Sequence, residues 1–286
     1  SMRALLAALL LCLVAVSTRG ANCALRVALD GSKFGLPGRS VGGVLQHRLQ
    51  KIHSGEDIVL EASVALEAGV HAAGLVLNYR SSVPAFHSDF DKLRFSLNQM
   101  LPDDLRVLAA VPVPNAFHSG KDATGYAWRY VIDASPLGDP LLRYFAWRPS
   151  TPSWGTVVEN GGIAQKMRAA SQAWLGCHGL HSAEVREGLN GDAILIDLEG
   201  SQGSCKTIMQ LVASMVRTEE ERLLAELPSN TRALETLETL ESFLTQDAAN
   251  SIYVDRAQDA GVSAPAKGLA LRSVRYGTPP EEAEAL

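Results

Sequence analysis

The 286-residue sequence has few cysteines, and their positions argue against two kinds of site. The four thiols are Cys12, Cys23, Cys177 and Cys205, and their spacing matches no pattern of zinc ligands. A disulfide framework is not expected either, because a chain of this length can bury a sizeable core without crosslinks. We therefore expect no metal site, two buried thiols in the folded domain and two thiols in an N-terminal leader.

The sequence also lacks an excess of basic residues. Lys and Arg number 26 against 31 Asp and Glu, which gives a formal net charge of −5. Proteins that bind RNA usually have a basic face, because neutralising phosphates supplies much of their affinity. The acidic balance is mild evidence against RNA as a ligand. Apolar residues make up 47% of the chain and charged residues 20%, a composition typical of globular proteins.

The apolar run in the leader is short for a membrane span. It extends from Ala4 to Val16, follows one arginine, and is succeeded by small and polar residues up to Gly20. A spanning helix needs about 20 apolar residues, whereas this layout is typical of a secretory signal peptide. We predict that residues 1–22 are a targeting leader, or a short anchor that associates with a membrane through residues 4–16.

Hydrophobic periodicity predicts an alternation of strands and helices in the rest of the chain. This order indicates an α+β fold in which two halves share a mixed or antiparallel sheet with helices packed on it. The halves are predicted at 23–135 and 136–277, with a disordered acidic tail at 278–286. The strands are expected at 25–30, 57–62, 73–79, 105–113, 127–132, 193–198 and 269–276, and the helices at 41–52, 90–101, 163–175, 205–226 and 232–246.

Four stretches occur in the order, and at nearly the spacing, of the motifs of one known family. The first, L-D-G-S-K-F-G at 29–35, is similar to Y-D-G-S-x-Y/F-x-G, and the second, E-A-G-V-H-A at 67–72, to G-R-T-D-A-G-V-H-A. The third, L-N-Q-M-L-P-D-D-L at 97–105, is similar to L-N-x-x-L-P-x-D-I, and is followed by F-H at 117–118 and W-R-Y at 128–130, where the family has F-H-A-R and Y-R-Y. The fourth, P-A-K-G-L-A-L at 265–271, is similar to P-A-x-G-L-x-L. Between residues 25 and 277 the chain therefore resembles the TruA family of tRNA pseudouridine synthases.

The resemblance implies a fold and a chemistry. The family's two α/β halves enclose a central cleft, where uracil is detached from its ribose, rotated and rejoined through carbon without metal or cofactor. An aspartate acts as nucleophile or base, an arginine lies beside it, a tyrosine stacks on the flipped uracil, and a further basic residue comes from the second half. An enzyme that acts on a base must take that base out of the stack and hold it by such contacts.

This chain departs from the family at those positions. The aspartate is replaced by Glu67 and the arginine two residues earlier by Ala65. The longer side chain moves the carboxylate by roughly 1.5 Å, and a misplacement of about 1 Å can cost on the order of a hundredfold in rate. The tyrosine position aligns with Trp128, and the basic residue of the second half aligns with Met209. Glu67 is therefore the catalytic candidate only if the chain is active.

The same alignment predicts the other site residues. Trp128 and Tyr130 are the candidates for stacking on a base. His71, Arg129 and Lys33 are expected to face the cleft or an RNA, although His71 also fits a histidine that only stabilises the fold by hydrogen bonding. Between residues 181 and 193 the chain looks too short for a strand that the family usually has, so we expect a deletion beside the cleft.

These observations favour a non-catalytic, structural or assembly subunit of a larger organellar complex. The first alternative is an active tRNA pseudouridine synthase that uses Glu67. The second is a non-catalytic binder of tRNA or rRNA that uses Trp128, Tyr130, Arg129 and Arg143. The leader favours a plastid reached through the secretory route, with the mitochondrion as the alternative. The expected partners are protein subunits of that complex, and the resemblance implies that a homodimer can form.

Overall fold

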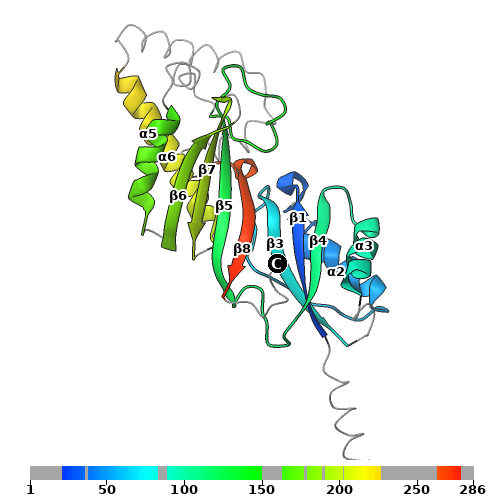
Figure 1. The fold of residues 1–286 in the computed structure, drawn as a ribbon. Helices are drawn as coiled ribbons and strands as arrows, with labels where there is room; N and C mark the ends of the chain where they lie inside the picture. Colours follow the sequence, from blue (N-terminus) through cyan, green and yellow to red (C-terminus); the bar gives the residue numbers. More distant parts are fainter. Residues whose placement is uncertain are drawn as a thin grey trace, which may run out of the picture.

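The computed structural model describes residues 21–35, 38–82, 89–149, 163–176, 179–188, 191–201, 203–226 and 263–277. In this part of the chain a single mixed sheet has the strand order β4-β1-β3-β8-β5-β7-β6, and β2 pairs with β3 beside this path (Figure 1). The α+β class with a shared mixed sheet is thereby confirmed. The strands are β1 (Ala21–Leu29), β2 (Leu60–Ala62), β3 (His71–Ser81), β4 (Leu105–Val113), β5 (Ala123–Asp133), β6 (Leu180–Glu187), β7 (Ala193–Gly200) and β8 (Leu269–Tyr276).

Two helices pack on the N-terminal strands, and each is defined by a cap and an apolar stripe. Before α2 (Val41–Ile52), the Ser40 hydroxyl accepts the Gly43 N–H at 3.0 Å. Before α3 (Phe90–Met100), the Asp89 carboxylate accepts the Lys92 N–H at 2.9 Å. Such caps satisfy N–H groups that a helix start leaves without partners. The buried residues recur every four positions, as expected for a helix with one face on a core: Leu45 and Leu49 in α2, and Leu93 and Leu97 in α3.

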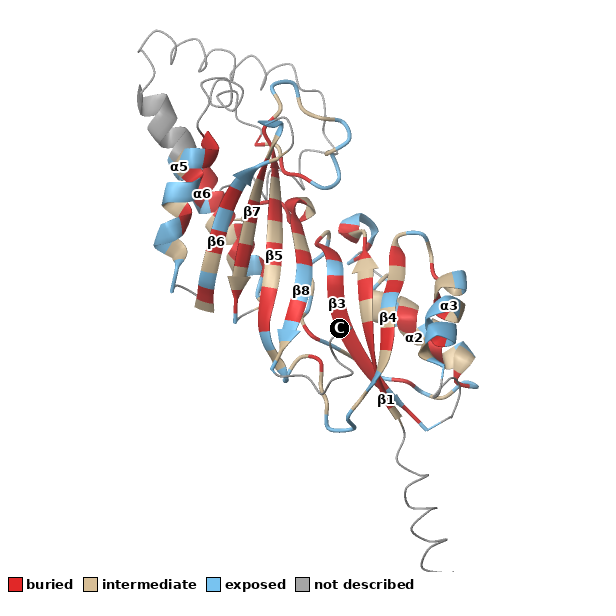
Figure 2. Ribbon diagram, viewed as in Figure 1, coloured by how far each residue is buried: buried red, intermediate tan, exposed pale blue. Residues whose placement is uncertain are grey.

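The C-terminal strands carry a second pair of helices, α5 (Ile163–Ser171) and α6 (Cys205–Glu226) (Figure 1). Short 3-10 helices stand at the sheet's ends: η1 (Gly31–Lys33), η2 (Gln172–Trp174) and η5 (Ala266–Gly268). Buried residues from both halves form one continuous hydrophobic cluster between sheet and helices (Figure 2). None of the helices in the described ranges is long and apolar enough to cross a membrane.

The last strand of the chain joins the two halves of the sheet. β8 pairs in parallel with β3 through His71–Ala270 and Ala72–Leu271, and antiparallel with β5 on its other edge. Because paired residues share a face of a sheet, the register also fixes which side chains lie on the same side as Ala72 and Leu271. Because Trp128 of β5 pairs with Leu271, it lies on this same side of the sheet.

Most predicted elements are present, and several keep their predicted bounds. The helices at 41–52 and 205–226 and the strands at 105–113 and 269–276 start and end where periodicity placed them. The predicted strand at 57–62 begins only at Leu60, and the helix predicted at 163–175 ends at Ser171 and continues as η2. Residues 1–20 of the predicted leader, the predicted helix at 232–246 and the acidic tail lie outside the described residues, whereas Ala21 and Asn22 belong to β1.

Two expectations about the chain are wrong. The predicted deletion beside residue 181 is not there, because β6 occupies Leu180–Glu187 and pairs along β7. The pattern was missed because β6 mixes charged residues with apolar ones and has one exposed side. Cys23, assigned to the leader, is a buried residue of β1, as Asn22 is. Cys23 and Cys205 are both free and buried, and Cys177 lies outside the described residues.

Candidate functional site

Glu67 lies in the connection between β2 and β3, which is fixed to the fold by backbone hydrogen bonds. The N–H of Ser63 donates to the carbonyl of Val76 at 2.8 Å, and the N–H of Gly69 donates to the carbonyl of Phe34 at 3.3 Å. Gly69 has a φ of 86°, a left-handed conformation that glycine adopts without a steric penalty. The glycine of the motif therefore closes the turn that presents Glu67.

The Glu67 side chain is exposed and has no positive partner. Among the described residues, no Lys, Arg or His forms an ion pair with its carboxylate, and the neighbouring Ala65 is exposed as well. The thiol of Cys205, at the start of α6, lies 3.7 Å from the Ala65 carbonyl. Burial raises the pKa of this thiol to about 11, so it is neutral at physiological pH.

A cavity of about 220 Å³ opens beside Glu67. Its walls come from the sheet, the first turn of α2 and the β2–β3 connection, and most of its lining side chains are aliphatic. Glu67 is the single ionisable residue among the described residues that line it, and the others include Leu29, Leu66, Leu75, Leu77 and Val41. In the part of the chain that the structure describes, no arginine or lysine lines this cavity to hold a phosphate or a substrate carboxylate.

His71 is buried, and both of its ring nitrogens are used by the fold. Nδ1 accepts the Gly31 N–H at 2.9 Å, and Nε2 lies 2.9 Å from the Tyr144 carbonyl, to which it must donate. Burial lowers the pKa of His71, although Asp30, 3.3 Å from Nδ1, opposes this shift. The imidazole is therefore neutral near pH 7 with its proton on Nε2, and it has no free nitrogen for a substrate.

Lys33 is exposed at the end of η1, close to a loop that follows β5. In that loop the Arg143 guanidinium lies 4.4 Å from the centre of the Tyr144 ring. Hydrogen bonding and charge from Arg143, with a smaller effect of Lys33, lower the pKa of Tyr144. The Phe145 ring packs 5.0 Å from the His71 ring. The structure thus brings His71 and Lys33 near a surface formed by Arg143, which the sequence analysis named as a candidate, and by Tyr144 and Phe145, which it did not.

The two residues predicted to stack on a base are in the core. Trp128 is 1% exposed and Tyr130 is 0% exposed. The Tyr130 hydroxyl donates to the Pro265 carbonyl at 2.6 Å, whereas Nε1 of Trp128 has no hydrogen-bond partner among the described residues. In this conformation neither ring offers a face to a base.

Arg129 lies on the other side of the sheet from Trp128 and Tyr130, because successive residues of a strand point to opposite faces. Its Nε and Nη2 donate to Asp197 Oδ1 and Oδ2 at 2.7 and 2.8 Å. Arg186 also pairs with Asp197, and Arg272 lies 3.9 Å from it. Burial would raise the pKa of Asp197, but hydrogen bonds from Arg129 and Arg186 outweigh burial and lower it.

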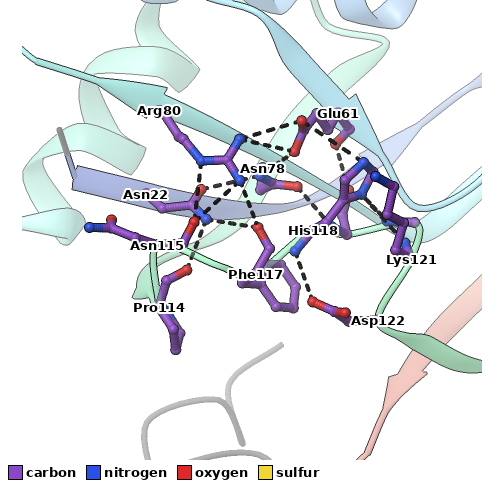
Figure 3. A network of polar contacts seen from close by, with 12 residues as sticks. Asn22, Glu61, Asn78, Arg80, Pro114, Asn115, Phe117, His118, Lys121 and Asp122 are labelled. Atoms are coloured by element: carbon purple, nitrogen blue, oxygen red, sulfur yellow. Dashed lines mark hydrogen bonds and ion pairs between the residues drawn. The ribbon is translucent and has the colours of Figure 1, made fainter. Parts of the chain in front are cut away.

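The positions that correspond to the family's remaining basic and aromatic residues also serve the fold. Met209, which aligns with a basic residue, is a buried side chain of α6. Phe117 and His118 belong to a loop held against the sheet by a polar network (Figure 3). In that network Asn78 donates to Asn22 at 3.1 Å, and Asn22 donates to the Phe117 carbonyl at 2.9 Å.

The predicted site residues therefore do not form one surface in this structure. His71 and Lys33 lie near each other, Arg129 is paired with Asp197, and Trp128 and Tyr130 are buried. In the described part of the chain, no three His, Cys, Asp or Glu side chains gather in a way that could hold a metal ion. Arg129 and Asp197 are directly opposite each other on β5 and β7. Their ion pair could have been predicted from the sequence only if the register of these two strands had been known.

Curated relatives of known name match almost the whole chain. The chain is 32% identical over 271 residues to the tRNA pseudouridine synthase A of Roseiflexus sp. (strain RS-1), which covers 89% of this chain and 90% of the relative. It is 29% identical over 269 residues to the enzyme of the same name from Roseiflexus castenholzii, covering 92% and 93%. It is also 29% identical over 256 residues to that of Citrifermentans bemidjiense, covering 84% and 89%.

No family model matches the chain. The relatives nevertheless match 84–92% of the chain, and the motifs quoted above begin or lie at β1, β3, α3, β5 and β8. Identity of this level over nine-tenths of both chains establishes common ancestry and a common fold. The chain belongs to the tRNA pseudouridine synthase A family.

Proposed function

We propose that this chain is a member of the family that has lost pseudouridine formation and acts as a structural or assembly subunit of an organellar complex. The observation that carries the proposal is the surroundings of Glu67. Its carboxylate meets no cation among the described residues, and the cavity beside it is apolar. A tRNA substrate is a polyanion, and its binding depends on cations that neutralise phosphates.

The remaining positions support the same proposal. The arginine that the resemblance places beside the aspartate is Ala65, and the basic residue of the second half aligns with the buried Met209. The ring in the tyrosine position, Trp128, is enclosed by the core. A flipped base held by aromatic stacking needs an accessible ring face. Two of the positions that the resemblance assigns to the chemistry, Met209 and Trp128, thus carry core side chains, and a third, Ala65, carries no charge.

Support for a role in protein assembly comes from the loop after β5. Leu137 is 97% exposed, Leu141 80% and Phe145 47%, although the loop itself is well anchored. The Asp133 carboxylate accepts the N–H groups of Ser135 and Asp139 at 2.9 and 3.0 Å. Apolar side chains gathered on an ordered, exposed loop are typical of a protein interaction site.

The first experiment measures catalysis. We would incubate the purified full chain with tRNA labelled with tritium at carbon 5 of uridine and follow tritium release. The relative from Roseiflexus sp. is the positive control, and Glu67→Ala is the matched variant. We expect release with the relative and none with this chain. Release that disappears in Glu67→Ala would refute the loss of catalysis.

The second experiment tests the structural role. We would isolate the native particle that contains the chain, determine its mass and identify its proteins by mass spectrometry. We expect a large organellar assembly of defined protein subunits. Leu141→Asp should release the chain from the assembly without unfolding it, because Leu141 is exposed. A particle of one or two chains would contradict the proposal.

The alternative is an active tRNA pseudouridine synthase that uses Glu67. It is favoured by the names of the relatives and by the carboxylate that Glu67 retains in the motif. This alternative predicts tritium release that depends on Glu67. The same assay therefore decides between the two functions.

A further inference from the structure

The cavity beside Glu67 has the properties of a small-molecule site. It has a volume of about 220 Å³, and its floor is formed by Leu29, Leu75 and Leu77 of the sheet. Phe34 and Val41 contribute further apolar wall. An engineered apolar cavity of about 150 Å³ is large enough to bind benzene. The space beside Glu67 therefore fits an organic molecule of one ring with a short side chain.

The charge at this cavity has one sign. Among the described residues, Glu67 is the single ionisable one in the lining, and no cation forms an ion pair with it. The Ser40 hydroxyl, which accepts the N–H of Gly43, is a neutral group of the described lining and cannot offset this charge. A ligand with a phosphate or carboxylate would meet repulsion from Glu67. A ligand with an ammonium group would gain a charge-assisted hydrogen bond.

The walls of the cavity are held in place before any ligand arrives. Two backbone hydrogen bonds fix Phe34. Its N–H donates to the Gly31 carbonyl at 2.9 Å, and its carbonyl accepts the Gly69 N–H at 3.3 Å. The Val70 N–H donates to the Glu67 carbonyl at 3.1 Å and closes the turn. Binding to such a preformed site costs little ordering of the protein.

We propose that this cavity binds a small apolar amine, with its ring or branched chain among Leu29, Leu75 and Leu77 and its ammonium group on Glu67. The aliphatic walls fit this ligand better than a nucleotide, which carries phosphate and a polar sugar. The inference rests on the proposed loss of pseudouridine formation, because an active enzyme would hold a uridine against Glu67. Amine binding and tritium release are measured separately, so either proposal can fail alone.

The test uses 2-phenylethylamine as the probe and 3-phenylpropionate as its counterpart of opposite charge. Each is titrated into the full chain with labelled methyl groups, and NMR follows the methyl resonances of Leu75 and Leu77. We expect saturable shifts at these two residues with the amine and none with the carboxylate at the same concentrations. Equal shifts with both probes would overturn the proposal, because the carboxylate of Glu67 would then not select the ligand.

Two variants test the charge and the space separately. Glu67→Gln removes the charge at an exposed position and should lower the affinity for 2-phenylethylamine by about three- to tenfold. Gly42→Leu should abolish binding, since Gly42 lines the cavity and a Cβ there meets no atom within 4 Å. His47→Leu, on an exposed position of the same helix, is the control and should bind normally. Unchanged affinity in either Glu67→Gln or Gly42→Leu would refute the site.

Discussion

The backbone N–H of Gly31 donates to Nδ1 of His71 at 2.9 Å and thereby joins two family motifs that are 40 residues apart. Nε2 of the same imidazole donates a hydrogen bond to the Tyr144 carbonyl. The Asp-Gly-Ser and Gly-Val-His stretches are thus parts of one hydrogen-bonded unit at the junction of β1, β3 and the loop after β5. Both stretches therefore contribute to the stability of this junction, whatever the role of Glu67.

Gly31→Ala adds a single methyl group, but it should destabilise the protein strongly. A Cβ at this position would lie 2.1 Å from the carbonyl oxygen of Val70, and backbone atoms cannot move aside as a side chain can. We expect a loss of about 2–3 kcal/mol in the free energy of unfolding, measured with urea. Gly42→Ala is the control, because its Cβ meets no atom within 4 Å. It should leave stability unchanged or raise it by about 0.5 kcal/mol. Equal losses in both variants would refute the steric explanation.

His71→Asn should lower stability at neutral pH by about 1–2 kcal/mol, because the bond to the Tyr144 carbonyl is lost. Asparagine can still accept the Gly31 N–H. Burial holds the pKa of His71 below its unfolded value of about 6.5. The neutral histidine therefore stabilises the fold above that pH, and this contribution is lost as pH falls through the folded pKa. Urea unfolding at pH 7.5 and 5 should show the difference between wild type and variant shrinking at the lower pH. A constant difference would contradict it.

Asp197→Asn should remove the centre of the arginine cluster on the side of the sheet opposite Trp128 and Tyr130. We expect a loss of about 1–2 kcal/mol at pH 7, since a partly buried carboxylate with a two-point arginine partner is replaced. The folded pKa of Asp197 is lowered, so its stabilisation is present above the unfolded value of about 3.9 and is lost as pH falls through the folded pKa. Urea midpoints of the two proteins should converge in acid. Glu184→Gln is the exposed control on β6 and should change little.

Met209→Arg and Ala65→Arg each introduce an arginine at a position where the resemblance implies a basic residue. We expect the first to destabilise the fold and the second to leave its stability unchanged. Met209 is 7% exposed, so a guanidinium there would be buried without a partner and should cost about 3 kcal/mol. Ala65 is exposed and lies near the Glu67 carboxylate in the chain, so Ala65→Arg should be tolerated. Thermal unfolding distinguishes the two variants. A stable Met209→Arg protein would show that the second half has kept room for a cation.

Local patterns were sufficient for most of the secondary structure. Helix α2 was predicted at its observed bounds because its apolar residues recur at helical spacing, and β4 because it is an apolar run that begins after a turn. These signals act over a few residues, through backbone sterics and hydrogen bonds, and need no knowledge of the rest of the chain. β6 was missed because its exposed side carries charges, which hide a strand that is stabilised by its pairing with β7.

The sequence by itself determined the family and the chemical groups that are present, because residue identity and motif order can be read without a structure. The resemblance of its motifs aligns Ala65 and Glu67 with the arginine and aspartate of the family. Only the tertiary structure decided that Trp128 is enclosed, that Arg129 is paired with Asp197 on the opposite side of the sheet, and that an apolar cavity lies beside Glu67. These features depend on strand order and register, which bring together residues about 70 positions apart, and no short-range pattern in the chain encodes such contacts.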